Sequence, residues 1–289
     1  MQRNDLQSGF LEAKRITKYF AKTFFLASLF LPERKRLAAY SVYAICRISD
    51  ESVDAKNSSC QAESLNEIKT RVHTAYSNEK LNDKLLLCFR ATVNRFSIPE
   101  EYFNQLIEGM RMDIVQNRYR DFKELYSYCY RAAGIVGLIM LKIFGADENK
   151  AKNFAVDLGI AMQLTNILRD IKEDYQRGRI YLPLQELDKF MVTEKDIKTQ
   201  NNNTNFKALM LYQINRCREY YKGSKKGIRM IPGLRERFVA IAMREIYAAI
   251  LNEIERNKFD VFTKRARVNI FKKIIIIFNI LIRGEYLCV

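Results

Sequence analysis

Two pairs of aspartates, each separated by three residues, are the side chains of this sequence best suited to chemistry. The first pair is Asp50 and Asp54, and the second is Asp170 and Asp174. Residues four apart lie on one face of an α-helix, so each pair would present two carboxylates one turn apart. Burying such charges is costly unless they are paired or bound to a metal. Each pair therefore belongs to a solvated helix face or needs a cationic partner.

Other polar side chains share these two faces. At about 100° per residue, Gln163 and Asn166 lie on the face of the second pair, and Tyr43 and Arg47 lie on the face of the first. The flanking residues are apolar at helical spacing, which predicts two largely buried helices. A second acidic stripe makes the solvated-face interpretation less favourable than it would be for one stripe alone.

Two acidic stripes that face each other across a helical bundle would form a cage of four carboxylates, which would repel one another without cations. Oxygen ligands select hard ions, so we expect Mg²⁺, with Mn²⁺ as an alternative. Mg²⁺ usually takes part of its shell from substrate phosphates, and guanidinium groups match phosphate in bidentate geometry. Arg177 and Arg179 follow the second pair. The pattern indicates metal-assisted binding of a diphosphate.

Such a site would have a defined chemistry. Metal ions can stabilise a leaving diphosphate and so ionise an allylic C–O bond. The resulting carbocation needs a dry cavity lined by aromatic faces. The 18 Phe and 16 Tyr of the chain could supply such a lining, although each one alone is more typical of a core residue.

The elements that must position these side chains are helices. The 289 residues are 48% hydrophobic, with only four prolines and eleven glycines. We expect one all-α domain over residues 1–289, with roughly ten to twelve helices. The expected helices are 8–29, 33–53, 62–77, 82–96, 98–117, 122–144, 149–175, a short one after Pro183, 205–225, 233–256 and 266–282.

Two details of this prediction concern helix packing and mobility. Gly134 and Gly137 lie within the largely apolar helix 122–144, and these small residues indicate a close approach of a neighbouring helix. Residues 195–204 are polar and rich in asparagine, and they are the best candidate for a mobile loop.

The composition limits the kinds of binding partner and the cellular compartment that we expect for this protein. The six cysteines lack CxxC spacing, and the single histidine, His73, lies in a polar stretch, so we expect no disulfide framework, no zinc site and no histidine triad. The net charge of +16 favours an anionic partner such as nucleic acid, anionic lipid or a phosphorylated substrate. We expect neither a signal peptide nor a membrane span, since the apolar run 274–282 is shorter than the required 20 or so residues.

Five blocks, in order along the chain, resemble the squalene/phytoene synthase family. The second aspartate-rich block reads Gln-Leu-Thr-Asn-Ile-Leu-Arg-Asp-Ile-Lys-Glu-Asp over residues 163–174 and continues as Arg-Gly-Arg-Ile-Tyr-Leu-Pro over 177–183. The other four blocks are 22–54, 109–113, 126–137 and 259–265. In the first block, Glu51 stands where the family often has a second adjacent aspartate.

The resemblance implies an isoprenoid synthase helical bundle with a central cavity. It also implies head-to-head condensation of two prenyl diphosphates through a cyclopropylcarbinyl diphosphate. By motif position, the implied metal ligands are Asp50, Asp54, Asn166, Asp170 and Asp174. The implied diphosphate ligands are Arg47, Arg169, Arg179 and Arg265. The residues implied to line the site and help to orient substrate are Tyr43, Gln163, Asn166 and Tyr181, with Asp113 and Tyr128 as weaker correspondences.

The product follows less directly from the resemblance. We expect geranylgeranyl diphosphate to be converted to phytoene in carotenoid biosynthesis, because the run 177–183 and the chain length resemble carotenoid-type enzymes. The alternative is farnesyl diphosphate, with dehydrosqualene, presqualene diphosphate or squalene as product. NADPH is expected as a cofactor only if the product is squalene.

Two rival classes remain open. A non-catalytic relative of the family, acting in binding or assembly, should have lost its carboxylates, and all four are present here. A nucleic-acid-binding protein is suggested only by charge, with no zinc finger, RNP-type run or basic heptad region. We therefore expect prenyl diphosphates and no nucleic acid as partners. We also expect a cytoplasmic location, with peripheral contact at the inner face of the membrane, and the sequence leaves the oligomeric state open.

Overall fold

A computed structural model describes residues 2–54 and 58–287, without the side chains of 2, 3, 50–54 and 58–60. It is built from helices in the described residues, with no β-strand there and one isolated bridge between Arg118 and Ile180. The helices in chain order are α1 (Gln2–Phe20), α2 (Lys22–Ser28), α3 (Glu33–Asp54), α4 (Ser58–Tyr76), α5 (Lys84–Phe96), α6 (Glu100–Val115), α7 (Phe122–Cys129), the π-helix η1 (Tyr130–Gly134), α8 (Ile135–Phe144), α9 (Glu148–Arg169), α10 (Ile171–Gln176), α11 (Leu184–Lys189), α12 (Glu194–Lys198), α13 (Thr204–Ile228), α14 (Leu234–Arg256) and α15 (Ile270–Arg283).

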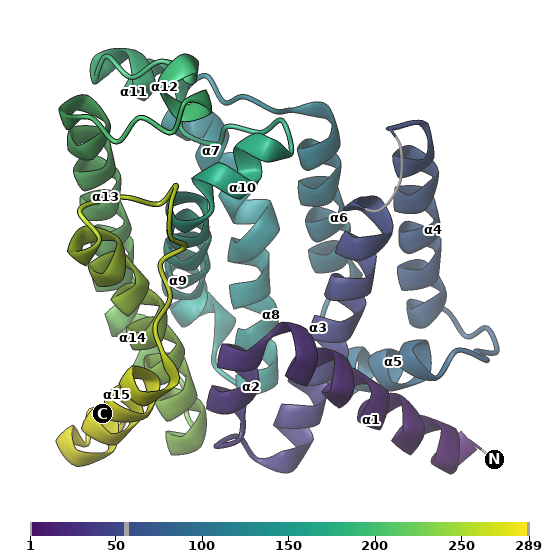
Figure 1. Ribbon diagram of the computed structural model, residues 1–289. Coiled ribbons are helices and arrows are strands. Elements are labelled where there is room, and N and C mark those ends of the chain that lie inside the picture. The colour runs from purple at the N-terminus through teal and green to yellow at the C-terminus, as the bar shows by residue number, and fades with distance from the viewer. Residues whose placement is uncertain (1, 55–57, 288–289) are drawn as a thin grey trace.

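Helices α8 and α9 lie at the centre of the bundle (Figure 1). On one side, α13 and α14 pack against α9, and on the other side α3 and α6 pack against α8. Helices α10, α11 and α12 lie together at the top of the view, while α1, α2 and α15 lie at the bottom. The buried apolar side chains form one cluster that includes residues from α1 to α15. The expected all-α class is confirmed.

The close approach predicted at Gly134 and Gly137 is confirmed for the α8–α9 contact. A Cβ atom on Gly137 would lie 2.3 Å from the carbonyl oxygen of Ala155, and one on Gly159 would lie 2.3 Å from that of Ala133. Only glycine allows the two backbones to come this near. The same region contains η1, so the predicted helix 122–144 is continuous but includes a π-helical turn.

Local hydrogen bonds explain where several helices begin. The side chains of Asp83, Asp121, Asp147, Asn203 and Asn269 accept hydrogen bonds from backbone N–H groups in the first turns of α5, α7, α9, α13 and α15. These groups would otherwise lack partners, because the first turn of a helix has no preceding carbonyls.

The predicted single helix 8–29 is wrong in detail, since α1 and α2 are separated at Ala21, whose backbone angles are φ −119° and ψ 55°. Alanine is the strongest helix former, so packing rather than propensity decides this break. Helix α2 contacts α14, and its Phe25 stacks on Tyr40 of α3 with ring centroids 5.6 Å apart.

The prediction of a mobile loop at 195–204 is also wrong. Residues Glu194–Lys198 form α12, which begins with a capping box between Thr193 and Asp196. The asparagines that follow are tied down: Asn201 donates to Asp196 at 2.8 Å, and Asn203 caps α13. Asparagine in this segment serves caps and turns, for which its short amide is well suited.

One stretch of the described helices, Phe122–Phe144, is long and apolar enough to cross a membrane by length and composition alone. Half of its most apolar window is buried within the protein, and α8 contributes Ile139 and Ile143 to the centre of the core. Its apolar character is accounted for by this packing against α9 and α6.

Candidate active site

Asn166, Asp170 and Asp174 lie on consecutive turns where α9 passes into α10. The expected single helix 149–175 is interrupted at Asp170, whose backbone angles are φ −108° and ψ 18°. The N–H of Asp170 nevertheless donates to Asn166 O at 2.9 Å, and that of Asp174 donates to Asp170 O at 2.9 Å. Because these four-residue hydrogen bonds continue through the break, the three side chains stay on one face. The predicted polar stripe is therefore present on one face across the break between the two helices.

Two arginines clamp Asp170. Nε and Nη2 of Arg169 donate to its carboxylate oxygens at 2.8 and 2.5 Å, and the same atoms of Arg265 donate at 2.7 and 2.7 Å. Both pairs have the bidentate geometry of strong guanidinium–carboxylate contacts. Burial alone would raise the pKa of Asp170, but the hydrogen bonds from Arg169 and Arg265 outweigh burial, so its pKa lies below the ordinary value.

Arg265 reaches this clamp from the connection between α14 and α15. In that connection the Asp260 carboxylate accepts hydrogen bonds from the N–H groups of Phe262 and Thr263, each at 3.0 Å. The Phe262 side chain is buried, and Lys172 of α10 donates to its carbonyl oxygen at 2.8 Å. The α10 helix thus anchors the segment that carries Arg265 beside Asp170.

Asp174, one turn beyond Asp170, lies in a different environment. Burial raises its pKa to about 7, and the negative charges of Asp170 and Asp113 act in the same direction, while Arg177 and Arg179 oppose the shift. A carboxylate that is this poorly compensated is stabilised by a bound cation. Asp174 also lines a small pocket together with Arg179 and Tyr181.

Arg179 is positioned by a tight turn after α10. Gly178 has φ +80°, a left-handed conformation that glycine adopts without strain. The turn brings the N–H of Arg179 to the carbonyl oxygen of Asp174 at 2.9 Å, while its side-chain Nε donates to the carbonyl oxygen of Asp113 at 3.1 Å. The predicted diphosphate ligand Arg179 therefore lies between Asp113 and Asp174.

Asp113, at the end of α6, accepts hydrogen bonds from two predicted site tyrosines. Tyr181 donates to its Oδ1 at 2.7 Å and Tyr128 donates to its Oδ2 at 3.0 Å, and the two tyrosine rings stack with centroids 5.0 Å apart. Gln163 of α9 approaches the Tyr128 hydroxyl at 3.5 Å. Burial, reinforced by the charge of Asp113, raises the pKa of both tyrosines, so they remain protonated donors.

Several oxygen atoms here suit a divalent metal. Asn166 Oδ1 and Glu173 Oε2 are buried without a hydrogen-bond partner among the described residues. Such oxygens and the Asp174 carboxylate match the donor preference of a hard cation. No three His, Cys, Asp or Glu residues with described side chains are arranged around one metal position. The side chains of Asp50 and Asp54 lie outside the described residues, and only their backbone, in α3, is assigned.

The described part of the first stripe contains Tyr43 and Arg47 of α3. The Arg47 guanidinium lies over the ring of Phe20 at 4.4 Å, a cation–π contact, and the Phe24 ring lies 6.1 Å from that of Tyr43. Helix α8 contacts both α3 and α9 and so connects the two halves of the predicted site. That the two acidic stripes face each other stays a prediction.

Sequence reasoning missed two tyrosines of the site. The Tyr119 ring stacks on that of Tyr181 at 5.7 Å, and Tyr119 lies outside any helix, where no periodic pattern marks it. Tyr247 of α14 is partly buried, and the loss of hydration around its hydroxyl raises its pKa, while Arg169 and Arg265 lie close enough to oppose the shift. Its position in an ordinary amphipathic helix gave no signal. Asp113, expected to be only a weak correspondence, is instead the hub of the tyrosine cluster.

An all-α bundle with buried carboxylates, several arginines and an aromatic cluster is the architecture of a diphosphate-binding helical enzyme. Comparison with known proteins defines the class further. Residues 17–272 match the squalene/phytoene synthase family. The chain is 37% identical over 282 residues to 15-cis-phytoene synthase of Synechococcus elongatus, covering 93% of this chain and 91% of that protein. It is 38% identical over 275 residues to a phytoene synthase of Arthrospira platensis, covering 90% and 88%.

Solved structures agree with this assignment. A dehydrosqualene synthase in complex with a ligand superposes with a TM-score of 0.90 at 28% identity, covering 99% of each chain. A squalene synthase from Alicyclobacillus acidocaldarius superposes with a TM-score of 0.81 at 26% identity, covering 88% of this chain and 96% of that one. The chain therefore belongs to the squalene/phytoene synthase family. It is a prenyltransferase with the isoprenoid synthase helical fold, in a family that generally depends on divalent metals.

Proposed function

We propose that this protein joins two molecules of geranylgeranyl diphosphate head to head and forms phytoene, and that residues 1–289 act as one domain. The observation that carries the proposal is the identity of 35–39% to phytoene synthases over about nine-tenths of the chain. In the first half-reaction, the donor diphosphate leaves, the C2–C3 double bond of the acceptor attacks the allylic cation at C1, and loss of a proton from C1 closes the cyclopropane ring of the cyclopropylcarbinyl diphosphate. In the second half-reaction, this intermediate loses its diphosphate, rearranges to an allylic cation and loses a proton to give phytoene.

The arginines hold the leaving diphosphate. Arg169 and Arg265 present bidentate guanidinium groups at Asp170, and Arg179 lies beside Asp174. Arg47 of α3 is proposed as a further diphosphate ligand. Guanidinium groups on several sides balance the charge of a diphosphate while keeping their donors fixed in direction.

The oxygen side chains of the two aspartate stripes are proposed to hold Mg²⁺, or Mn²⁺. The proposed ligands are Asp50, Asp54, Asn166, Asp170 and Asp174. When bound, the metal supplies Lewis-acid stabilisation of the departing diphosphate oxygens. The raised pKa of Asp174 and the unpaired Asn166 Oδ1 support a cation at this place.

The aromatic cluster shields the reacting carbons from water. Tyr128 and Tyr181 direct their hydroxyls to Asp113, so neither hydroxyl group is left free beside the aromatic rings. Ring faces carry partial negative charge and stabilise a nearby cation. Tyr43 and Gln163 are proposed to orient the prenyl chain from α3 and α9.

A second product has a specific observation in its favour. The superposition on a dehydrosqualene synthase over 99% of the chain supports farnesyl diphosphate as donor, with dehydrosqualene or presqualene diphosphate as product. Squalene would require NADPH for the final reduction. A non-catalytic relative is a weaker alternative, since the sequence retains all four aspartates.

The test is product analysis with both donors. Purified protein is incubated with Mg²⁺ and geranylgeranyl or farnesyl diphosphate, with and without NADPH, and the extract is analysed by mass spectrometry. We expect a C40 hydrocarbon from geranylgeranyl diphosphate without NADPH. A C30 product alone would select the alternative, and the absence of any hydrocarbon or cyclopropyl intermediate would contradict synthase function.

The apolar substrate tails and product also lead us to propose a cytoplasmic enzyme in peripheral contact with the inner face of the membrane. Nucleic acid is not a proposed partner. A gel-shift assay that found salt-sensitive DNA binding would contradict that part.

A further inference from the structure

Helix α15 presents an apolar face to solvent. Phe271, Phe278 and Ile282 have exposed fractions of 75%, 60% and 68%. Five more large apolar side chains of this helix and its C-terminal extension are exposed: Ile270, Ile274, Ile275, Leu281 and Leu287. Scattered apolar residues are normal on a surface, but a contiguous set on one helix indicates an interaction site. We call this set the outer face of α15.

The lysines of the same helix turn the other way. Lys272 reaches inward to the buried Glu253 at 2.5 Å, and Lys273 donates to Thr23 of α2 at 2.6 Å. In a surface helix whose only solvent is water, charged side chains face outward and apolar ones face inward. In α15, Ile277 and Ile280 face inward as expected, but most of the outer face is apolar as well, so that face is suited to an apolar environment.

The apolar surface extends beyond α15. Phe238 of α14 contacts both Phe30, at 4.6 Å between ring centroids, and Tyr286, at 5.5 Å. The exposed side chains of Leu29 and Leu287 directly adjoin Phe30 and Tyr286 in the chain. This end of the molecule therefore combines apolar side chains from three separate segments.

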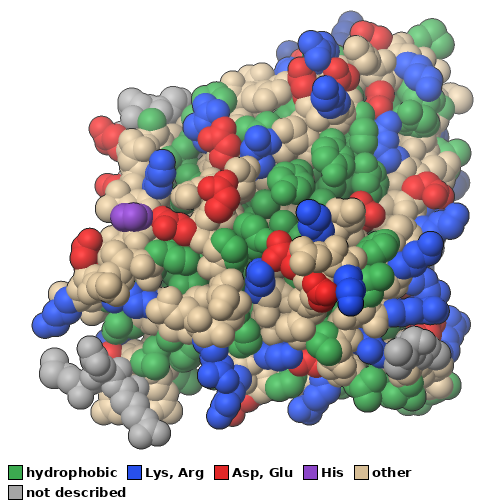
Figure 2. Space-filling view, turned by 180° about the vertical axis from the view of Figure 1, so that it is seen from behind, with side chains coloured by type: hydrophobic (Ala, Val, Ile, Leu, Met, Phe, Trp, Pro, Cys, Tyr) green, Lys and Arg blue, Asp and Glu red, His purple; other side chains and the backbone are tan. Residues whose placement is uncertain are grey.

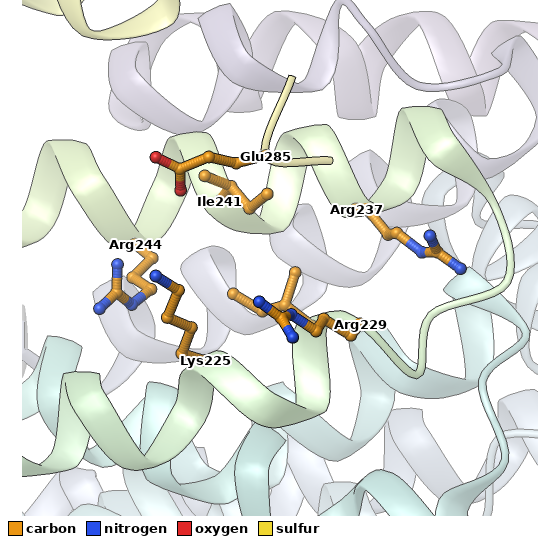
Figure 3. Close-up of a pocket in the computed structure, with 7 residues that line it drawn as sticks. Lys225, Arg229, Arg237, Ile241, Arg244 and Glu285 are labelled. Carbon is orange, nitrogen blue, oxygen red and sulfur yellow. The ribbon is translucent and has the colours of Figure 1, made fainter. Parts of the chain in front are cut away.

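A basic pocket lies next to this surface, between α13, α14 and the residues that follow α15 (Figure 3). Lys225 of α13 and Arg244 of α14 lie side by side, Arg229 lies further along, and Glu285 approaches from the C-terminal residues. Arg237 points away, toward the connection between α13 and α14, where it donates to the Ile231 carbonyl at 2.5 Å. From behind, Lys and Arg side chains gather along the lower right edge, where these helices end (Figure 2).

We propose that the outer face of α15 docks on a bilayer that contains anionic phospholipid, with a lipid phosphate in the pocket of Lys225, Arg229 and Arg244. An amphipathic helix with basic neighbours binds such an interface through apolar burial and charge attraction together. Charge complementarity favours this occupant over a second copy, since each copy carries a net charge of +16. The inference deepens the proposed function by naming the surface and the lipid chemistry of its membrane contact.

The first experiment removes the apolar contact. Full-length protein is sedimented with sucrose-loaded vesicles of phosphatidylcholine alone or mixed with about 30 mol% phosphatidylglycerol, which gives the surface a negative potential. A variant with Phe271→Ser, Ile275→Ser and Phe278→Ser should lose at least about tenfold in vesicle affinity. The matched control carries Leu11→Ser, Met191→Ser and Leu211→Ser, which replace exposed apolar residues elsewhere, and should bind like the wild type.

The second experiment removes the charge. Lys225→Gln with Arg229→Gln should weaken binding to anionic vesicles by about fivefold per charge and leave binding to neutral vesicles unchanged. The control pair, Lys195→Gln with Lys198→Gln, removes the same charge from α12 and should have little effect. Equal affinity of the wild type for neutral and anionic vesicles would overturn the proposed lipid chemistry.

Two further measurements distinguish a failure of the docking proposal from a failure of the proposed function. Light scattering reports the oligomeric state: a wild-type dimer that the α15 variant converts to a monomer, with vesicle binding unchanged, would identify a second copy as the occupant and overturn the proposal. Activity in detergent micelles reports the synthase reaction apart from docking. We expect the α15 variant to be active in micelles, and inactivity of the wild type there would contradict the proposed function while leaving the vesicle result to stand.

Discussion

Asp170 and Asp174 lie one turn apart on the same face, yet their surroundings move their pKa values in opposite directions. Arg169 and Arg265 bind both oxygens of Asp170 and hold its pKa below the ordinary value despite burial. Asp174 is buried beside two other negative charges, and its pKa is raised to about 7. The charges of the two carboxylates are therefore balanced differently: arginines compensate Asp170, whereas Asp174 is left among uncompensated negative charge.

The largest effect on turnover is expected at Asp174, because the arginines of the protein compensate its negative charge least. Asp174→Asn should reduce kcat at least about a thousandfold, because the proposed metal site loses an anionic ligand while the fold tolerates the neutral isostere. Steady-state turnover with circular dichroism as the folding check measures this. Asp188→Asn, at an exposed position in α11, is the control, and an active Asp174→Asn enzyme would remove Asp174 from the metal site.

Arg265→Gln tests Asp170, the aspartate whose charge is already balanced by two arginines. It removes one of the two guanidinium groups at Asp170, and we expect kcat/KM to fall by about 10- to 100-fold through weaker diphosphate binding. Arg267→Gln, two residues along and also exposed, should stay close to the wild type. If the two variants behave alike, Arg265 holds Asp170 in place without contributing to substrate binding.

The pH dependence of stability should separate the two aspartates. The folded-state pKa of Asp174 is above its unfolded value, so the metal-free protein binds an extra proton and loses stability as the pH rises from about 4 to 7. The loss is at most about 4 kcal/mol for a shift of this size. Asp170 has the opposite sign, since its contribution is present above the unfolded pKa and is lost as the pH falls.

Thermal melts in EDTA across this pH range measure the slope. Asp174→Asn should flatten it, and Mg²⁺ should raise the melting temperature of the wild type most at neutral pH, where the carboxylate is charged. A slope that persists in Asp174→Asn would assign the titration to another group.

The smallest effect is expected in the tyrosine cluster. Tyr181→Phe keeps the stacked ring but removes the 2.7 Å hydrogen bond to Asp113, which should cost about 1–2 kcal/mol of unfolding free energy. Tyr128→Phe removes the longer bond of 3.0 Å and should cost less. Chemical denaturation compares the two, and a reversed order would show that Tyr128 rather than Tyr181 carries the main contact to Asp113.

The helical period predicted the stripe from Gln163 to Asp174 because apolar neighbours fixed which face was buried. It could not predict the single non-helical residue at Asp170, since the backbone hydrogen bonds continue across it. The clamp by Arg265 joins residues 95 positions apart. Spacing within one helix contains no information about such a contact, and the family resemblance indicated only that Arg265 would bind diphosphate.

Other features could not be predicted from the sequence because they depend on how the helices pack together. Nothing at Ala21 marks a helix end, and the break serves the contact of α2 with α14. The apolar run near residue 278 was visible in the sequence, but which way Phe278 and Lys272 point depends on where α15 rests. Asp113 was undervalued because a lone aspartate at a helix end usually has only local partners.

The connection between α14 and α15 also limits the distance from the diphosphate clamp to the start of α15. Arg265, bound to Asp170, is followed by only four residues before α15 begins at Ile270. An extended chain spans at most about 3.6 Å per residue, so the backbone of the diphosphate clamp lies within about 18 Å of the start of α15. That distance is close to the thickness of one leaflet of a bilayer. If α15 docks on a bilayer as proposed, the diphosphate clamp therefore lies no farther than about this distance from the docked helix.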